Sequence, residues 1–206
     1  MESQGSTNQF PIANPIQIKM KHPTVLNVGI YDSDKTTLTK DYPYYAAWHA
    51  MLVWVYCQKS RANNPGYVGC SVHPDWHLFS NFKTWMELQD WKGKCLDKDL
   101  LVPGNKIYGP DTCLFVSKKV NSLLTKQLRR KGIYPLGVHP WGSRYKASMR
   151  KNMKTHHIGV FDSPEEAHAA YCLEKAEWVE SVAALETCAK TKKVLLREAA
   201  LLRSTL

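Results

Sequence analysis

The sequence predicts an α+β fold, in which helices and short strands occupy separate stretches of the chain. Three observations predict it. Residues 44–55 place apolar side chains at helical spacing, and residues 144–150 alternate in the manner of a strand. No Gly or Pro interrupts the chain from Glu165 to Leu206, which favours a long C-terminal helix. At 206 residues, the chain suits one or two small domains.

The first 40 residues are rich in proline and polar side chains and predict an extended lead-in, with one strand over residues 24–31. A helix is expected after Asp41, because Pro43 suits its first turn and Asn63-Asn64-Pro65-Gly66 would end it. A short strand over residues 67–72 comes next. Ser80 is then expected to cap a second helix that ends at Gly93 and carries aromatic core residues.

The stretch Cys95–Ser117 predicts two short strands around a Pro103-Gly104-Asn105 loop, followed by a helix over residues 118–132. From Leu136 to Ser163 a sheet is expected. One face would carry Tyr145, Ala147 and Met149, and the other Arg144, Lys146, Ser148 and Arg150.

Ser163-Pro164-Glu165-Glu166 is typical of a helix start, with a cap, a proline in the first turn and acids at the positive end of the dipole. The chain after this start is expected to form one long helix, or two joined near residues 190–193. Its apolar residues would pack on the body or on a partner helix, in a homodimer or against a host protein. These residues are Val194, Leu195, Leu201 and Leu202.

The positive charge is concentrated in one segment. From Lys118 to His157 the chain has eleven Lys or Arg and no Asp or Glu, and the other 17 basic residues face all 18 acidic ones. Charge runs are usually solvated loops. Here the absence of compensating acids and the interleaved Tyr134, Trp141 and Tyr145 favour binding of a polyanion, and we expect double-stranded DNA.

No stretch of about 18 apolar residues occurs, so no membrane partner is expected. The polar start predicts no secretory signal, and we expect the protein in the cytoplasm of the cell that makes it. Without a CxxC pair in a chain of this size, the six cysteines are expected to be reduced and packed.

Hydrolysis of a phosphodiester needs a divalent cation with oxygen ligands and a base that activates water. Asp97 and Asp99 share one face of a predicted strand, and the following helix could bring Asn121 beside Asp97. From the residues alone, two acids next to lysines would equally form ordinary surface ion pairs.

The stretch "LDKDLLVPGNKIYGPDTCLFVSKKVNSLL" resembles the HNH (His-Me finger, ββα-metal) motif of phage homing endonucleases, and the likeness extends over residues 42–124. The resemblance implies that Asp97 and Asn121 hold one Mg²⁺ or Mn²⁺. Lys98 stands where relatives have the general-base histidine, and Thr112 where they have the asparagine that orients it. The candidate catalytic residues are Lys98, Asp99, Asn105 of "GNK" and Thr112.

Lys98 is poorly suited to be a base, because neighbouring carboxylates favour its charged form and raise its pKa. It could instead hold a phosphate, with His73, His77 or Asp99 activating water. Cys70, His73 and His77 also have spacing that a zinc site could use, but one ligand is missing, and zinc is not expected.

Residues 137–177, with Trp141, "RYKASMR" and "HIGVFDSPEEAHAAY", resemble the Apetala2-type DNA-binding domain. The resemblance implies a three-stranded antiparallel sheet in the major groove, packed on a helix. The chain would divide into an extended segment (1–40), an HNH-like endonuclease domain (41–131), the reader (132–180) and a C-terminal helix (181–206). Candidate DNA-binding residues are Trp141, Arg144, Lys146, Arg150, Lys154, Arg129 and Arg130.

The leading hypothesis is a metal-dependent DNA endonuclease or nickase of the phage HNH type, acting in the infected host cell. Two alternatives remain, both built on a catalytically silent finger. One is a DNA-binding regulatory protein. The other is an inhibitor that binds a host protein.

Overall fold

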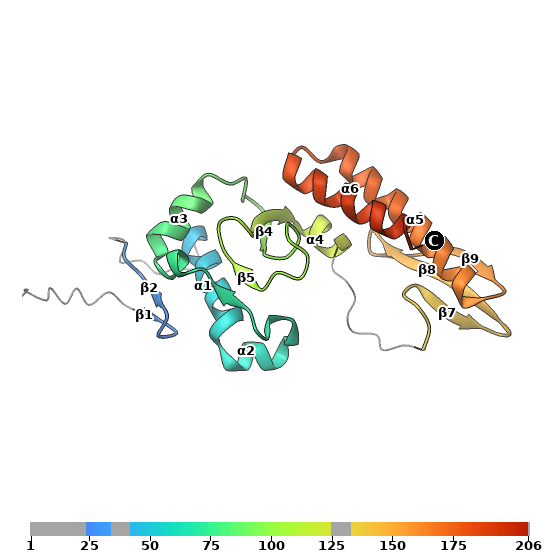
Figure 1. Ribbon diagram of the computed structural model, residues 1–206, viewed down its shortest axis with the longest axis horizontal. Coiled ribbons are helices and arrows are strands. Elements are labelled where there is room, and N and C mark those ends of the chain that lie inside the picture. Colours follow the sequence, from blue (N-terminus) through green and yellow to red (C-terminus); the bar gives the residue numbers. More distant parts are fainter. Residues whose placement is uncertain (1–23, 34–41, 125–132, 206) are drawn as a thin grey trace, which may run out of the picture.

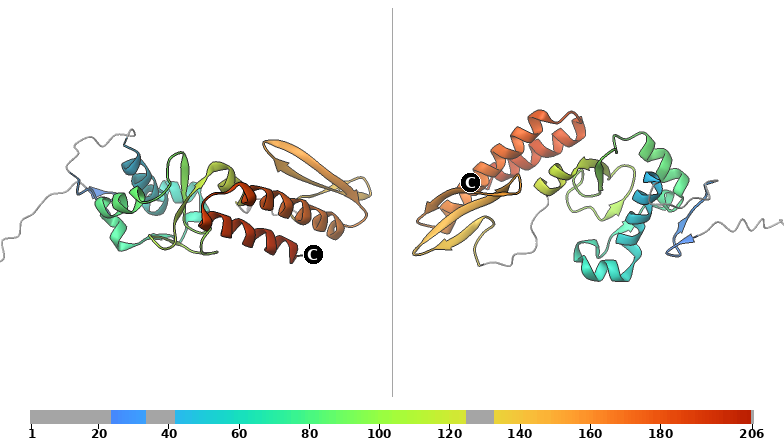
Figure 2. Two further views of the ribbon diagram at one scale, coloured as in Figure 1. Left: turned by 90° about the horizontal axis from the view of Figure 1, so that it is seen from above. Right: turned by 180° about the vertical axis from the view of Figure 1, so that it is seen from behind.

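The computed structural model describes residues 24–33, 42–124 and 133–205 of the chain. The predicted α+β class is confirmed: helices and four small sheets are arranged along an elongated molecule (Figure 1). Helices α1–α3 lie at one end and the sheet β7–β9 at the other. The strand β4 and helix α4 lie between them, as the views from above and behind also show (Figure 2).

The N-terminal half contains short strands and three helices. The strand predicted over residues 24–31 is instead a hairpin, because Leu26 and Asn27 adopt positive φ and turn the chain. Tyr67 lies in a 3₁₀ turn, so the strand predicted over 67–72 shortens to its last two residues. The elements are β1 (Thr24–Val25), β2 (Gly29–Ile30), α1 (Pro43–Tyr56), α2 (Gln58–Asn63), β3 (Ser71–Val72) and α3 (Phe79–Glu87).

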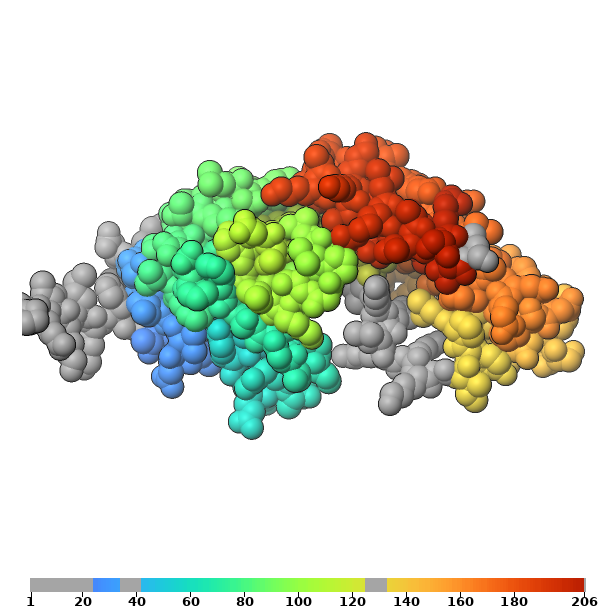
Figure 3. Space-filling model, viewed as in Figure 1, coloured from blue at the N-terminus to red at the C-terminus, as the bar shows by residue number. Residues whose placement is uncertain are grey.

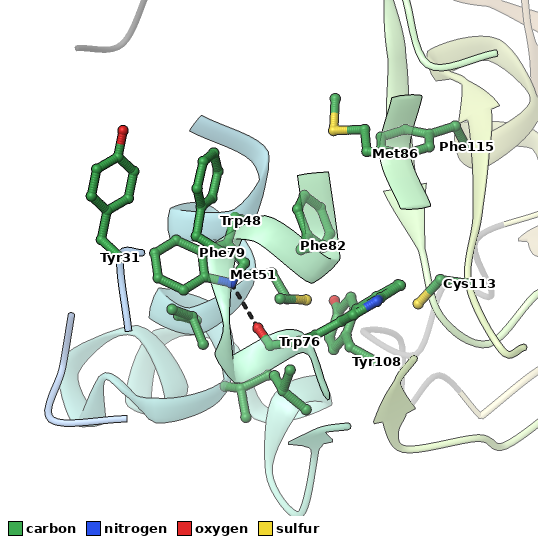
Figure 4. Packing of buried hydrophobic residues seen from close by; sticks show 13 residues of the cluster. Tyr31, Trp48, Met51, Trp76, Phe79, Phe82, Met86, Tyr108, Cys113 and Phe115 are labelled. Atoms are coloured by element: carbon green, nitrogen blue, oxygen red, sulfur yellow. Dashed lines mark hydrogen bonds between the residues drawn. The ribbon is translucent and has the colours of Figure 1, made fainter. Parts of the chain in front are cut away.

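The core of this half is aromatic. Trp48 of α1 lies fully buried against Phe79, and its indole Nε1 donates to the carbonyl of Trp76 at 2.7 Å (Figure 4). Gly29 fits here only because it has no side chain: a Cβ would come within 2.4 Å of Leu52. Burial of this many large rings is the main source of stability in this half.

Helix α3 is not capped by Ser80, although the sequence predicts this cap. It begins one residue earlier, and Ser80 donates from both its backbone N–H and its hydroxyl to the carboxylate of Asp32. The carboxylate of Asp32 thus accepts from an N–H at the start of α3 that has no partner within the helix. These hydrogen bonds connect the N-terminal hairpin to α3.

The middle of the chain is a strand–strand–helix unit. Strand β4 (Lys94–Asp97) pairs antiparallel with β6 (Leu114–Ser117), and α4 (Lys118–Leu124) follows β6 without a break and packs on both strands. Between them, β5 (Ile107–Tyr108) leaves this pair and lies parallel to β3. The part of the predicted helix beyond Leu124, with Arg129 and Arg130, lies outside the described residues.

The three-stranded antiparallel sheet is confirmed, in the order β7 (Val138–Trp141), β8 (Arg144–Lys151) and β9 (Lys154–Phe161). Helix α5 (Pro164–Leu185) packs across one face, and Ser163 caps it by accepting from the N–H of Glu166. Met149 contacts the buried Tyr171 of this helix. Ser148, expected on the open face, is only 8% exposed.

Two helices, not one, end the chain. Residues 186–188 separate α5 from α6 (Ala189–Arg203), and the two helices lie side by side (Figure 1). Val194 and Leu195 are buried in the body of the protein, Leu202 is half buried, and Leu201 is exposed. Most of the apolar face expected for a partner is therefore covered by the chain itself.

A second core joins the middle of the chain to these helices. The expected boundary after residue 180 falls inside α5. The space-filling view shows α6, in red, lying against the yellow-green middle segment (Figure 3). The buried residues of this core are Leu114, Val116, Val120 and Leu123 from the middle, and Ala176, Val179, Val182, Ala183, Leu195 and Ala199 from the helices.

All six cysteines are free thiols. Across the described ranges, none of the helices has the length and apolar character needed to cross a membrane.

Candidate functional site

The candidate cation site lies at the end of β4. Asp97 is the last residue of this strand, and its Oδ1 accepts from the N–H of Asp99 at 2.9 Å and of Leu100 at 3.0 Å. We call residues 97–101 the Asp97 turn. These two hydrogen bonds fix one carboxylate oxygen and the path of the backbone together.

The electrostatic surroundings of Asp97 disfavour its negative charge. Burial raises its pKa from 3.8 to about 6, and the neighbouring carboxylate of Asp99 adds to the shift, against the lowering effect of the two N–H donors. Within the described part of the chain, no basic side chain pairs with Asp97.

Lys98 points into the protein. Its residue is 7% exposed, and its Nζ lies 3.1 Å from Oδ2 of Asp99. The same nitrogen lies 6.0 Å from the ring centroid of Tyr67 and 5.9 Å from that of Tyr108, within the range of cation–π attraction. A buried and paired ammonium does not present its charge to a phosphate in this conformation.

Asn105 and Thr112 both hold the loop between β4 and β6. The Asn105 amide donates to the carbonyls of Lys98 at 2.6 Å and Ile107 at 2.7 Å. The Thr112 hydroxyl donates to the carbonyl of Ile107 at 2.7 Å. With their donors occupied by backbone carbonyls, both side chains act on the shape of the loop in this conformation.

Asn121 lies one turn into α4, half buried, on the helix that packs against β4. Carboxylate and amide oxygens are hard ligands, and Mg²⁺ is often bound by only one or two carboxylates plus waters and phosphate. The pair Asp97 and Asp99 fits that donor chemistry. Among residues 24–33, 42–124 and 133–205, no group of three or more His, Cys, Asp or Glu side chains is close enough to hold a metal.

The residues considered for zinc have separate partners. His73 Nδ1 accepts from the N–H of Asp75 at 3.3 Å, while His77 Nε2 lies 3.1 Å from the hydroxyl of Tyr56. Burial lowers the pKa of His77. The Cys70 thiol faces the carbonyl of Gly66 at 3.7 Å. Of the two histidines proposed as alternative bases, His73 has 45% of its side chain exposed.

The candidate nucleic-acid surface is the sheet face opposite α5. Register places Trp141 beside Arg144, so both side chains share this face with Lys146 and Arg150. Trp141 is 57% exposed, and Lys146 Nζ lies 4.6 Å from its ring centroid. Arg150 is exposed. Lys154 is exposed too, but it pairs with Lys151, whose side chain contacts Glu174 of α5, so its register places it on the other face. Exposed cations next to an exposed indole suit phosphate contact and base stacking.

Arg144 differs from the other cations of this face. Its Nε donates to Oδ1 of Asp162 at 2.6 Å, and its NH2 group lies 3.4 Å from the carbonyl of Val160. The guanidinium is thus already engaged within the sheet, which reduces the charge that it offers to DNA.

Two cations that sequence patterns did not single out connect the C-terminal helices to the middle of the chain. Lys175 of α5 donates to the carbonyl of Leu123 at 2.9 Å, and burial lowers its pKa to about 8. Arg197 of α6 donates to the carbonyls of Leu100 and Leu101. No local signal identifies these residues, because their partners are 52 and more than 90 positions away.

Comparisons of the chain with protein-family models, with curated proteins and with solved structures give no match. The function therefore has to be inferred from the chemistry of the described residues.

Proposed function

We propose that this protein binds double-stranded DNA and cuts one or both strands as a metal-dependent endonuclease or nickase of the phage HNH type. The observation that carries the proposal is the Asp97 carboxylate at the end of the first strand of a strand–strand–helix unit. It is half buried beside Asp99, has a raised pKa and has no basic partner in the described chain. A divalent cation would neutralise such a carboxylate.

Each residue of the candidate site would have a separate task. Asp97 would hold Mg²⁺ or Mn²⁺ with help from Asn121, and Lys98 would neutralise Asp99 from the protein side. A bound cation would stabilise the charge that develops on the phosphate in the transition state. His73, with its exposed ring, is the candidate to accept the proton of the attacking water.

The sheet face would supply the affinity for DNA. Arg150 and Lys146 are cations of this face without a carboxylate partner among the described residues, and Trp141 is exposed at the end of β7. Lys154, exposed at the start of β9, would add a cation at the edge of the sheet. The faces of three-stranded sheets fit the width of the major groove. This assignment matches the Apetala2-type resemblance, and most of these cations would contact phosphates rather than bases.

A plasmid-nicking assay tests the proposal. Supercoiled plasmid is incubated with the full chain and Mg²⁺ or Mn²⁺, with and without chelator, and Asp97→Ala is compared with wild type. We expect wild-type nicking that chelator abolishes and that Asp97→Ala loses by at least about 100-fold. Asp111→Ala removes an exposed carboxylate from the same loop and should cut normally. Equal cleavage by Asp97→Ala would refute the assignment.

A second candidate function is favoured by Lys98. A buried lysine stands where the resembled motif has its general base, and Asn105 and Thr112 bind backbone carbonyls. The chain would then be a DNA-binding regulatory protein on a catalytically silent finger. It would shift duplex DNA with a steep dependence on salt and break no strand with any divalent metal. The combined substitutions Arg144→Ala, Lys146→Ala and Arg150→Ala should abolish that shift.

A further inference from the structure

Arg197 of the last helix reaches the Asp97 turn from the other end of the chain. Its NH2 group donates to the carbonyl of Leu100 at 2.6 Å, and its NH1 group to the carbonyl of Leu101 at 3.0 Å. One guanidinium thus joins two consecutive peptide groups in a bidentate arrangement. Such a fork of donors fixes direction as well as distance, which a single hydrogen bond does not.

The Leu100 residue connects this arginine to the candidate cation ligand. Its carbonyl accepts from Arg197, while its N–H donates to Oδ1 of Asp97 at 3.0 Å. The N–H of Asp99 donates to the same oxygen. The turn is therefore held on one side by the Asp97 carboxylate and on the other by Arg197, so movement of either would move the other.

The backbone of Arg197 is held by buried neighbours, but the hydrogen bonding of its side chain is incomplete. Leu195 and Ala199, on either side of it along α6, are buried in the core shared with β6 and α4. Its Nε is buried without a hydrogen-bond partner among the residues that the structure describes, and its ion pair with Glu198 is long, at 3.4 Å. An unsatisfied buried N–H is destabilising, so stability alone does not explain an arginine here.

We propose that Arg197 is a positioning residue: through the Leu100 and Leu101 carbonyls it fixes the Asp97 turn and so aims the Asp97 carboxylate at its cation. The part concerning the cation rests on the proposed function, whereas the part concerning the turn does not. Each part has its own measurement.

Amide hydrogen exchange of the full chain tests the turn directly. In Arg197→Met, which keeps the apolar stem, the amides of Asp99 and Leu100 should exchange about 10-fold to 100-fold faster, because the turn opens locally. Amides of the β4–β6 pairs and of the sheet β7–β9 should be unchanged. Arg197→Lys keeps one donor and should recover part of the protection. Arg203→Met is the matched control, because Arg203 also lies on α6 and its side chain forms a surface ion pair with Glu180 of α5.

Equal exchange of these two amides in wild type and Arg197→Met would overturn the proposal. So would a loss of protection that spreads equally over β4, β6 and α4, because Arg197 would then act on overall stability. The milder Arg197→Lys provides the same comparison should the methionine variant fold poorly.

Binding of Mn²⁺ alone, measured by calorimetry on the full chain, tests the second part. Arg197→Met should weaken Mn²⁺ binding by about 10-fold or more, the usual effect of removing a residue that orients a metal ligand. Its affinity for DNA should stay at the wild-type value, since the sheet face is untouched. Faster exchange with unchanged Mn²⁺ affinity would overturn the link to the cation. A wild-type chain that binds no Mn²⁺ would refute the proposed function, and the exchange result would still decide whether Arg197 fixes the turn.

Discussion

Arg144 Nε and Asp162 Oδ1 lie 2.6 Å apart, so the first cation of the sheet face is held in an ion pair rather than offered to a ligand. The pair joins the start of β8 to the residue just after β9. Both side chains remain largely exposed, and an exposed pair of this kind contributes little to stability. Its main effect is on the positive charge that the sheet face offers to an anionic ligand.

Substitution Asp162→Asn should therefore strengthen DNA binding. The change removes a negative charge next to the cationic face and releases Arg144, and we expect a gain of about 3-fold to 10-fold in affinity at low salt. Fluorescence anisotropy with a labelled duplex measures it, and the gain should shrink as salt is raised. Glu165→Gln makes the same change of charge nearby, at a residue without an ion pair, and should have less effect. An unchanged or weaker affinity of Asp162→Asn would show that this face does not bind DNA.

Gly137 should tolerate no side chain. It has a φ of +85°, and a Cβ would lie 2.1 Å from Cδ2 of Tyr171, so Gly137→Ala must displace the ring that fixes α5 to the sheet. The free energy of unfolding should fall by about 3 kcal/mol or more in urea denaturation.

Gly142 provides the control for Gly137. Its φ is +59°, but a Cβ there would meet no atom within 4 Å, so Gly142→Ala should lose only about 1 kcal/mol for backbone strain. Equal losses for the two variants would show that the contact with Tyr171 is not tight in solution.

The pH dependence of stability should report the burial of Asp97. Its pKa is raised from 3.8 to about 6 on folding, so the folded state binds the proton more tightly than the unfolded chain does. Stability should thus fall as pH rises from about 4 to about 6, by a total of about 1–3 kcal/mol. Asp97→Asn keeps an oxygen acceptor for both N–H donors, and it should remove this fall.

Urea unfolding at several pH values in the presence of chelator measures the effect. Asp97→Asn should be more stable than wild type at pH 7, and the difference should vanish near pH 4. Asp111→Asn serves as the control, because that carboxylate is exposed. A stability difference between Asp97→Asn and wild type that stays constant over this pH range would contradict the burial of Asp97.

Asp32, which is half buried just after the N-terminal hairpin, should stabilise the N-terminal half of the chain. Asp32→Ala removes the acceptor of two hydrogen bonds from Ser80, at the start of α3, and should lower the free energy of unfolding by about 1.5–3 kcal/mol. Asp32→Asn retains one acceptor and should lose less. Asp75→Ala removes an exposed acid whose side chain pairs only with His73, and its stability should stay near that of wild type. Equal stability of Asp32→Ala and wild type would contradict this role.

Local sequence patterns predicted the strand over residues 144–150 and the start of α5, because both depend on neighbours in the chain. The alternation in residues 144–150 predicted which side chains face α5, because one face of the sheet is covered and the other is open. Ser163 predicted the start of α5, because capping depends on neighbours in the chain. The break between α5 and α6 has no Gly or Pro, and it arises because the helices bury their faces against each other.

The candidate site was predicted only in part, because several of its contacts join residues that are far apart in the sequence. Asp97 and Asp99 were expected on one strand, but the strand ends at Asp97 and Asp99 lies in the turn that follows. The burial of Lys98 depends on Tyr67 and Tyr108, which arrive from other elements. Arg197 is almost a hundred residues from the turn that it contacts. Periodicity and spacing carry no information about such contacts.

The single helix α5 serves both the sheet and the middle of the chain, which has a consequence for how the protein could be cut or recombined. A fragment ending before Pro164 would leave Val116, Val120 and Leu123 bare to water and prone to aggregation. A different three-stranded sheet could be grafted onto this chain only by exchanging the three strands and keeping both terminal helices. The sheet is therefore interchangeable in its strands alone, while its supporting helix belongs equally to the neighbouring unit.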